Sequence, residues 1–581
     1  MTTGIGAPTP DPDPDPGGQP PRVPTGQWAL GDRSPLNANE AWKAEEGGLA
    51  VRQRVLDRYA REGFAGIPAV DRAGRLRWWG LHTQRRPGIH GGRTAGLSAA
   101  ELDDEFFMLR VRIDGGAVSL DQLRVLADIA TRYARGSADI TDRQNVQFHW
   151  IRIEDVPAIW AALESVGLRT TEAGGDAPRA ILGSPVAGIA ADEIVDGTPA
   201  IEEITRRYVG DPDLANLPRK FKTAISGSPH QDVAHEINDV AFVGVWHPEH
   251  GPGFDLWVGG GLSTAPMLAR RLGAWVPLAE VVEVWHGVVA VFRDYGYRRL
   301  RSRARLKFLV ADWGPAKFRE VLEREYLRRP LLDGPPPPAP PGRRDHIGVH
   351  RQRDGRCYVG VAPIAGRVGG DILPNLVRAV QRAGSTRLRF TPEQKVLVLD
   401  VEDAKVPALL DDLAAIGLPG WPSAFRRGVM ACPGIQFCKL AIVETKATAA
   451  TLVAELERRF ADVADLAGVA GRPGSDLQPI SIRLNGCPNS CVRAQTADVG
   501  LRGIQLPDPA DPTGPTVEGF QVQLGGLAPD GGAGRRLRGL RTSGADLPDY
   551  LDRVLRRWLS QRAGAETFSA WVRRAEEADL R

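Results

Sequence analysis

The sequence predicts an α+β protein with mixed sheets, built from two diverged copies of one unit related by a pseudo-twofold axis. Strand-like and helix-like segments alternate in both halves of the 581-residue chain, which predicts layered α+β structure. Similar segments recur at an offset of about 250 residues, which indicates duplication. A proline-rich stretch at residues 333–345 separates the halves and is predicted to be a semi-rigid linker.

Each half begins with the same order of strand, glycine turn, helix and strand, recognised from periods of 2 and 3.6 residues. The first-half segments are Phe107–Ile113, Gly115-Gly116, Leu120–Tyr133 and Ile140–Ile151. The corresponding second-half segments are Tyr358–Ala362, Gly369-Gly370, Leu373–Arg382 and Phe390–Val401.

The repeat continues downstream into glycine-rich loops. Ile225–Pro229 corresponds to Leu484–Pro488, and Gly253–Gly260 corresponds to Gly519–Gly526. The loop at Gly259–Gly261 lacks both the G-x-G-x-x-G spacing and the later Lys-Ser/Thr of nucleotide cradles, so we interpret it as a turn. The sequence therefore predicts no dinucleotide fold.

Composition and the N-terminal region exclude several protein classes. Lys and Arg total 74 against 71 Asp and Glu, a net charge of +3, which argues against a general nucleic-acid binder. Residues 1–27 are rich in Pro, Asp and Gly and are predicted to be a disordered tail. The sequence shows no secretory signal and no apolar stretch of about 20 residues, so we expect a cytoplasmic protein without a membrane segment.

Four of the five cysteines form two short pairs, Cys432-x5-Cys438 and Cys487-x3-Cys491. Four thiolates can bind a tetrahedral zinc ion or a [4Fe–4S] cluster. The wide loops, and the proline after Cys432 and Cys487, favour a cluster, with zinc as the alternative. A disulfide framework fits poorly with a long, cysteine-poor chain in a reducing compartment. The fifth cysteine, Cys357, is predicted to be a buried apolar side chain.

A basic run at residues 298–307 places six Lys or Arg residues within ten positions. A solvated helix face explains most such runs. The alternation with Leu300, Ala304 and Leu306 instead predicts a half-buried segment, and buried cations need an anionic partner. The run therefore has two interpretations, a solvated face or a site for an anionic cofactor or substrate.

Five motifs together resemble the sirohaem-dependent sulfite and nitrite reductases. They are the two cysteine loops, Thr141–His149, Leu217–Lys222 and Ala304–Phe308. The resemblance covers roughly residues 75–575 and is strongest to the ferredoxin-dependent actinobacterial members. The domains that it implies are ferredoxin-like half-domains at 75–168 and 346–420, a first sirohaem-binding domain at 170–332, the linker at 333–345, and a second domain at 425–575 carrying the cluster and the proximal sirohaem ligand.

The resemblance implies two cofactors, sirohaem and a [4Fe–4S] cluster. Cys432, Cys438 and Cys487 would bind cluster irons, and Cys491 would bridge the cluster and the sirohaem iron. Sirohaem carries many carboxylates and demands paired cations. The residues implied to contact it are Arg143, Gln147, Arg305 and Lys307, with Asn145 and His149 nearby. For His149, a strand histidine satisfied inside the core is the alternative.

The resemblance assigns binding and protonation of a small oxyanion to Arg110, Arg179, Lys220 and Lys222. Arg suits fixed oxyanion binding, while a desolvated Lys lowers its pKa and can donate protons. The alternative for each residue is a surface or sheet-edge cation.

Two departures from the family concern a covalent crosslink. Relatives often carry Tyr where this chain has His82 and Cys where it has Gly174, so the crosslink between them cannot form here. Its absence is compatible with nitrite reduction. Against this, Lys220 and Lys222 favour doubly charged sulfite, since plant-type nitrite reductases more often carry Asn at the second position.

We therefore expect assimilatory six-electron reduction of sulfite to sulfide, with reduction of nitrite to ammonia as the alternative. The expected donor is ferredoxin or a similar small carrier, although a separate flavoprotein subunit would leave the same pattern. We expect a monomer that binds neither nucleic acid nor membrane. A non-catalytic interaction protein with a four-cysteine zinc site is the distant alternative.

Overall fold

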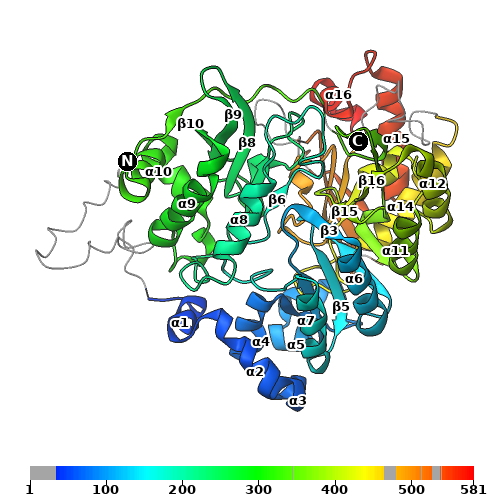
Figure 1. Cartoon of the computed structure of the whole chain (residues 1–581). Helices are drawn as coiled ribbons and strands as arrows, with labels where there is room; N and C mark the ends of the chain where they lie inside the picture. Colours follow the sequence, from blue (N-terminus) through cyan, green and yellow to red (C-terminus); the bar gives the residue numbers. More distant parts are fainter. Residues whose placement is uncertain are drawn as a thin grey trace, which may run out of the picture.

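The structure, a computed structural model of the chain, describes residues 35–342, 344–463, 479–508, 510–511, 513–526, 535, 537 and 539–581. The tail predicted at 1–27 lies outside the described residues. The described residues form four sheets of five or six strands with helices packed on them, so the predicted α+β class is confirmed (Figure 1).

The first sheet is antiparallel and belongs mainly to the first half. Its strand order is β1 (Leu81–Arg85), β2 (Asp103–Val111), β5 (Val146–Ile151), β4 (Ser137–Ile140) and β14 (Arg367–Gly369). Helix α6 (Leu120–Tyr133) lies against β4 and β5, and α7 (Val156–Ser165) packs beside α6. The α6 limits match the prediction because a reciprocal capping box between Ser119 and Gln122 starts the helix.

The second sheet repeats the first. Its order is β12 (Gly348–Arg351), β13 (Cys357–Val361), β16 (Val396–Val401), β15 (Arg387–Phe390) and β3 (Ala117–Ser119), with α11 (Ile372–Arg382) and α12 (Val406–Ala415) as its helices. The two halves exchange one short strand each, since β3 pairs with β15 and β14 pairs with β4. The duplicated units are therefore joined by backbone hydrogen bonds.

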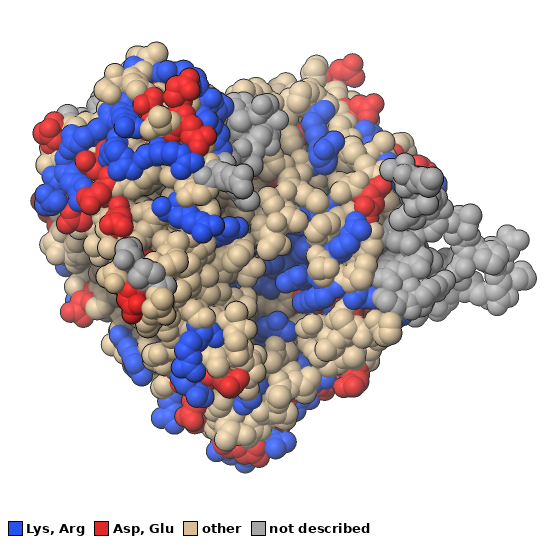
Figure 2. All heavy atoms as spheres, turned by 180° about the vertical axis from the view of Figure 1, so that it is seen from behind, with Lys and Arg blue, Asp and Glu red and all other residues tan. Residues whose placement is uncertain are grey.

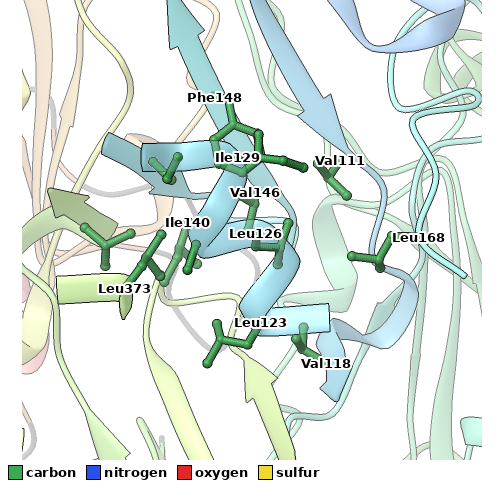
Figure 3. Close-up of a cluster of buried hydrophobic side chains, with 14 of the residues drawn as sticks. Val111, Val118, Leu123, Leu126, Ile129, Ile140, Val146, Phe148, Leu168 and Leu373 are labelled. Atoms are coloured by element: carbon green, nitrogen blue, oxygen red, sulfur yellow. The ribbon is translucent and has the colours of Figure 1, made fainter. Parts of the chain in front are cut away.

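Both units share one hydrophobic core. Leu123, Leu126 and Ile129 form the buried stripe of α6, at the spacing that a core-facing helix requires. They belong to the same cluster as Phe148 of β5 and Leu373 of α11 (Figure 3). Truncating Leu126 to Ala would cost about 2–5 kcal/mol of stability, the usual range for a buried leucine.

The other two sheets are mixed and also correspond to each other. The six-stranded sheet has the order β11 (Leu332–Asp333), β10 (Arg270–Val276), β9 (Gly251–Val258), β8 (Val240–His247), β7 (Thr223–Ser226) and β6 (Leu182–Gly183). The five-stranded sheet has the order β17 (Val429–Ala431), β18 (Ile482–Asn485), β19 (Val499–Leu506), β20 (Val517–Leu524) and β21 (Arg541–Ser543). In each, a parallel group of three strands continues into antiparallel ones.

Helices pack on both mixed sheets (Figure 1). The six-stranded sheet carries α8 (Thr198–Tyr208), α9 (Val281–Tyr295) and α10 (Leu306–Val321), and the five-stranded sheet carries α14 (Lys446–Arg459) and α15 (Leu547–Gln561). Among the described residues, no helix is both long and apolar enough to cross a membrane.

Candidate active site

The two cysteine pairs lie on loops that follow neighbouring parallel strands. β17 and β18 pair in parallel, with Ala431 opposite Leu484. Because the carboxyl ends of parallel strands meet at one sheet edge, Cys432 and Cys487 begin their loops side by side. The loops are also bonded to each other, since the Gly486 N–H donates to Sγ of Cys432 at 3.2 Å.

The four sulfurs are close enough to influence one another. All cysteines of the chain are free thiols. Burial, followed by the potential of the Cys491 sulfur, raises the pKa of both Cys432 and Cys487 to about 12. The same two causes raise the pKa of Cys438. Iron would replace these protons, and backbone N–H groups around the sulfurs provide the donors that tune an iron–sulfur site.

The two cysteine pairs could hold either a single metal ion or an iron–sulfur cluster. In the part of the chain that the structure describes, no three His, Cys, Asp or Glu side chains converge as the ligands of one ion do. Four sulfurs bound to zinc at about 2.3 Å would lie roughly 4 Å from each other. The described side chains do not converge on one ion, and four thiolates can also bind the separate irons of a [4Fe–4S] cluster.

A row of polar side chains crosses one face of the first sheet. Arg110 of β2 lies opposite Gln147 of β5. Gln147 in turn lies opposite Asp139 of β4, and Asp139 lies opposite Arg367 of β14. With its amide oxygen turned to Arg110, Gln147 accepts from Nη2 at 2.6 Å and from Nε at 3.1 Å. Arg367 donates to both oxygens of Asp139, at 2.9 and 3.0 Å.

His149 links this polar face to the first cysteine loop. Its Nε2 lies 3.2 Å from an oxygen of Asp139, and its ring stacks on Phe437 with centroids 3.7 Å apart. Burial lowers the pKa of His149, while Asp139 opposes this effect. His149 is therefore a buried residue that packs against the loop carrying Cys438 and forms a hydrogen bond with Asp139.

The four residues predicted to bind an oxyanion come together beside Cys491. Arg110 and Arg179 both donate to the Ala173 carbonyl oxygen, at 3.0 and 3.1 Å. Burial and the neighbouring Lys222, Arg305 and Arg179 lower the pKa of Lys220 well below its ordinary value, while Cys491 raises it. Burial lowers the pKa of Arg110 and the Cys491 sulfur raises it. The Cys491 sulfur therefore lies close enough to act electrostatically on both Lys220 and Arg110.

Lys222 lies in the same cationic group. Burial, then repulsion from Arg143, lowers the pKa of Lys222 to about 8, with Asp142 and Asp239 opposing the shift. In Figure 2, Lys and Arg side chains gather in a hollow near the middle of the face seen from behind. The cations Arg110, Arg179, Lys220 and Lys222 outnumber the nearby carboxylates Asp142 and Asp239, and a net positive pocket attracts a small anion.

Residues predicted to contact sirohaem line the same region, and several keep donors unused. Arg143 donates to Asn238 Oδ1 at 3.0 Å and to the carbonyls of Ala180 and Thr223. Arg305 donates to both oxygens of Asp239, at 3.1 and 2.9 Å. The Nε atoms of Arg143, Arg179 and Arg305 and Nδ2 of Asn485 are buried without a partner among the described residues. These donors fit a ligand rich in carboxylates.

The remaining two predicted contacts are engaged within the protein. The Asn145 side chain accepts from the Ile113 N–H at 3.0 Å and so holds the end of β2. Lys307 donates to the carbonyls of Leu262 and Ala265, at 2.8 and 2.6 Å, and closes the loop after Gly261. That loop is a turn, as predicted, and its backbone N–H groups already bond to carbonyls, for example Gly259 to Asp239.

The basic run at 298–307 is mainly neutralised by carboxylates of this chain. Arg301 forms a bidentate pair with Asp176 at 2.7 and 3.0 Å, and Arg298 lies 3.2 Å from Glu40. Only Arg305 and Lys307, at its end, reach the cationic group. Sequence reasoning missed these acidic partners, together with Asp239 and Asn238, because no local motif marks a carboxylate far along the chain from its cation.

A groove of about 800 Å³ borders the first cysteine loop but is not the cationic site. Its lining includes Ile435, Gln436, Arg85 and Lys446, and it contains none of the four predicted oxyanion-binding residues. Lys446 there donates to the Ala365 carbonyl at 2.5 Å.

The duplicated fold, the four-cysteine cage and the adjoining cationic pocket define an iron–sulfur oxidoreductase. A family model described as the nitrite and sulphite reductase 4Fe-4S domain matches residues 174–331, and one described as the ferredoxin-like half domain matches 100–166 and 350–416. The chain belongs to the nitrite and sulphite reductase family. The predicted family, enzyme class and cofactors, sirohaem and a [4Fe–4S] cluster, are thereby confirmed. The matched 174–331 copy contains no cysteine.

Relatives of both activities are similar over most of their length. The sulfite reductase [ferredoxin] of Mycobacterium tuberculosis is 58% identical over 96% of this chain and 98% of its own. The assimilatory ferredoxin-dependent nitrite reductase of Haloferax mediterranei is 33% identical over 92% of this chain and 91% of its own. The solved structure of the Mycobacterium tuberculosis NirA protein aligns with a TM-score of 0.90 and 56% identity, covering 95% of this chain and 99% of that one.

Proposed function

We propose that this chain is a ferredoxin-dependent sulfite reductase that carries out the six-electron reduction of sulfite to sulfide. The observation that carries the proposal is the grouping of Arg110, Arg179, Lys220 and Lys222 beside Cys491. A relative named sulfite reductase [ferredoxin], similar over nearly the full chain, supports the same assignment.

Two kinds of cation divide the work of the pocket. Arg110 and Arg179 are held by backbone carbonyls, so their remaining N–H groups keep a fixed direction for binding an oxyanion. Lys222, with its pKa lowered to about 8, stays largely protonated near neutral pH and can still release a proton. Lys220, whose pKa is lowered well below its ordinary value by burial and by Lys222, is the second proton donor. Oxygen atoms would leave as water after accepting these protons.

Sirohaem and the cluster supply the iron that binds substrate and the route by which single electrons reach it. Cys432, Cys438 and Cys487 would hold the cluster, and Cys491 would serve both groups. Arg143, Arg305 and Gln147 would face the sirohaem carboxylates, since the Nε atoms of the two arginines have no partner within the described part of the protein. Lys307 would support this side of the pocket by holding the loop after Gly261. Asn145 and His149 would not contact sirohaem directly. Asn145 would hold the end of β2, and His149 would hold the first cysteine loop.

The charge of the pocket favours sulfite over nitrite. A doubly charged anion gains about twice the Coulomb energy of a singly charged one from the same cations. Arg110, Arg179 and the largely protonated Lys222 contribute positive charge here, so the gain is larger for sulfite. Nitrite reduction is the second candidate function, supported by nitrite reductases that are 33–36% identical to this chain.

The electron donor would dock where the first cysteine loop reaches the surface. Leu440, two residues after Cys438, is 62% exposed, and Gln436 and Arg86, which both line the groove that borders this loop, are also exposed. An apolar contact near a cation suits a small acidic carrier. The donor is proposed to be ferredoxin, as the names of the relatives indicate, and a flavoprotein is the alternative.

Anaerobic turnover with chemically reduced ferredoxin tests the proposal directly. We expect kcat/KM for sulfite to exceed that for nitrite on one preparation with full sirohaem content. A preference for nitrite would support the second candidate function. Turnover of neither oxyanion, with reduced flavoprotein also tried as donor, would reject the proposal.

A further inference from the structure

Both arginines of the oxyanion pocket are anchored to one short backbone segment, Ala173–Gly175, which we name the arginine platform. Arg110 Nη1 and Arg179 Nη1 donate to the Ala173 carbonyl oxygen at 3.0 and 3.1 Å. Arg179 Nη2 donates to the Gly175 carbonyl oxygen at 2.7 Å. The two accepting carbonyls flank Gly174, so a movement at Gly174 turns both guanidinium groups.

The platform has no room for a side chain at its centre. A β-carbon added at Gly174 would lie 2.2 Å from the Arg77 carbonyl oxygen and 2.7 Å from Cε1 of His82. Contacts below 3.0 Å force a shift, and here one of the opposing atoms is backbone. The His82 ring and Gly174 are therefore matched in size.

His82 is tied to the same strand pair as Arg110. It lies on β1 opposite Met108, two residues from Arg110 on β2, so the two side chains share a sheet face. The Gly80 carbonyl oxygen lies 3.3 Å from Nδ1 of His82 and accepts the Arg110 N–H at 3.0 Å. The imidazole thus connects the strand that carries Arg110 to the platform that anchors its guanidinium.

The imidazole can occupy this position because it is uncharged. Burial and three surrounding cations, Arg110, Arg77 and Arg179, lower the pKa of His82 well below its ordinary value. The neutral tautomer with a proton on Nδ1 donates to Gly80 and adds no repulsion between the guanidinium groups. A cationic side chain in the same place would push them apart.

We propose that His82 and Gly174 act together as a positioning pair that holds the platform, and through it Arg110 and Arg179, in register for the oxyanion. This inference rests on the proposed function. His82 does not transfer protons in this scheme. Its contribution is to fill the space above Gly174, and the bare Cα of Gly174 lets the ring approach.

Variants of both residues test the pair in the holoenzyme. Gly174→Ala adds a β-carbon that displaces the arginine platform, and His82→Ala removes the ring that packs against Gly174. His82→Gln keeps a neutral polar side chain that cannot titrate. Gly96→Ala is the matched control, since a β-carbon there meets nothing within 4 Å. Sulfite binding is followed by titration of the haem absorbance, and turnover gives kcat and KM separately.

We expect Gly174→Ala and His82→Ala to raise KM and the Kd for sulfite roughly tenfold or more, the effect of losing one charge-assisted hydrogen bond. Both variants should keep kcat within about threefold and keep the sirohaem and iron content of the parent. His82→Gln should restore most of the affinity with an unchanged pH profile, and Gly96→Ala should match the parent.

Unchanged Kd in both Gly174→Ala and His82→Ala would overturn the inference. A loss of kcat with an altered pH profile in His82→Gln would also overturn it, because His82 would then be a proton donor. If the parent turns over neither oxyanion, the proposed function fails, and the Kd measured by titration still decides the positioning role. Should Gly174→Ala fail to fold, His82→Ala decides it alone.

Discussion

Removing the negative charge of Asp239 should affect both the ion pair with Arg305 and the pKa of Lys222. Asp239 is fully buried, and its carboxylate accepts from Arg305 Nη2 at 2.9 and 3.1 Å and from the Lys222 backbone N–H at 2.8 Å. Asp239→Asn keeps the shape of the side chain but leaves the Arg305 guanidinium buried without its counter-charge.

Two effects follow from this geometry. Breaking a buried ion pair costs about 3–5 kcal/mol, and since Asn still accepts one hydrogen bond we expect about 3 kcal/mol of lost unfolding free energy. Asp239 also raises the pKa of Lys222, which burial and Arg143 lower to about 8. Without Asp239 this pKa falls further, so the protonated lysine is lost at a lower pH.

Urea unfolding of the apoprotein measures the first effect, and the pH profile of kcat/KM measures the second. The alkaline limb of the profile should move to lower pH in Asp239→Asn. The control is Asp128→Asn, which removes an exposed pair with Arg132 on α6 and should cost less than about 1 kcal/mol. Equal stability of parent and Asp239→Asn, or an alkaline limb that moves to higher pH, would refute the reasoning.

Three further outcomes follow from named groups. Cys491→Ser should nearly abolish turnover if Cys491 is the shared ligand of cluster and sirohaem, as proposed above; retention of most activity would show that another residue bridges them. Lys222→Asn should reduce kcat/KM for sulfite more than for nitrite, since one positive charge is removed, and equal losses would contradict the charge argument. Glu172 is fully buried, and burial raises its pKa to about 7. Its folded pKa exceeds the unfolded value, so stability is lost as pH rises from about 4.5 towards 7. At pH 8, Glu172→Gln should therefore increase the free energy of unfolding by up to about 3 kcal/mol, which thermal unfolding would show as a higher Tm. An unchanged Tm would contradict the buried-carboxyl assignment.

Local signals in the sequence predicted most elements. The helix expected at Leu120–Tyr133 has those limits in the structure, because its capping box and apolar period act within a few residues. The helix expected at Leu373–Arg382 begins one residue earlier, at Ile372. The strand expected at Phe107–Ile113 runs instead over Asp103–Val111, because pairing with β1 and β5 sets its ends.

The site shows the same division. Cys432, Cys438, Cys487 and Cys491 were recognisable because few cysteines occur and their short spacings are covalently fixed. The interpretation of His149 required the fold, since Asp139 and Phe437 lie on other elements and engage the ring. His149 remains a predicted neighbour of sirohaem, yet its observed partners belong to the protein.

The sequence alone determined the duplicated α+β plan, the cysteine pairs and the types of cation, since these depend on residue identity and short-range periodicity. Tertiary structure decided the exchange of β3 and β14, the pairing of Arg305 with Asp239, and the meeting of Arg110 and Arg179 at Ala173. Such contacts join residues far apart in the chain. Their energies depend on distance and burial in space, and neither quantity is written in local sequence.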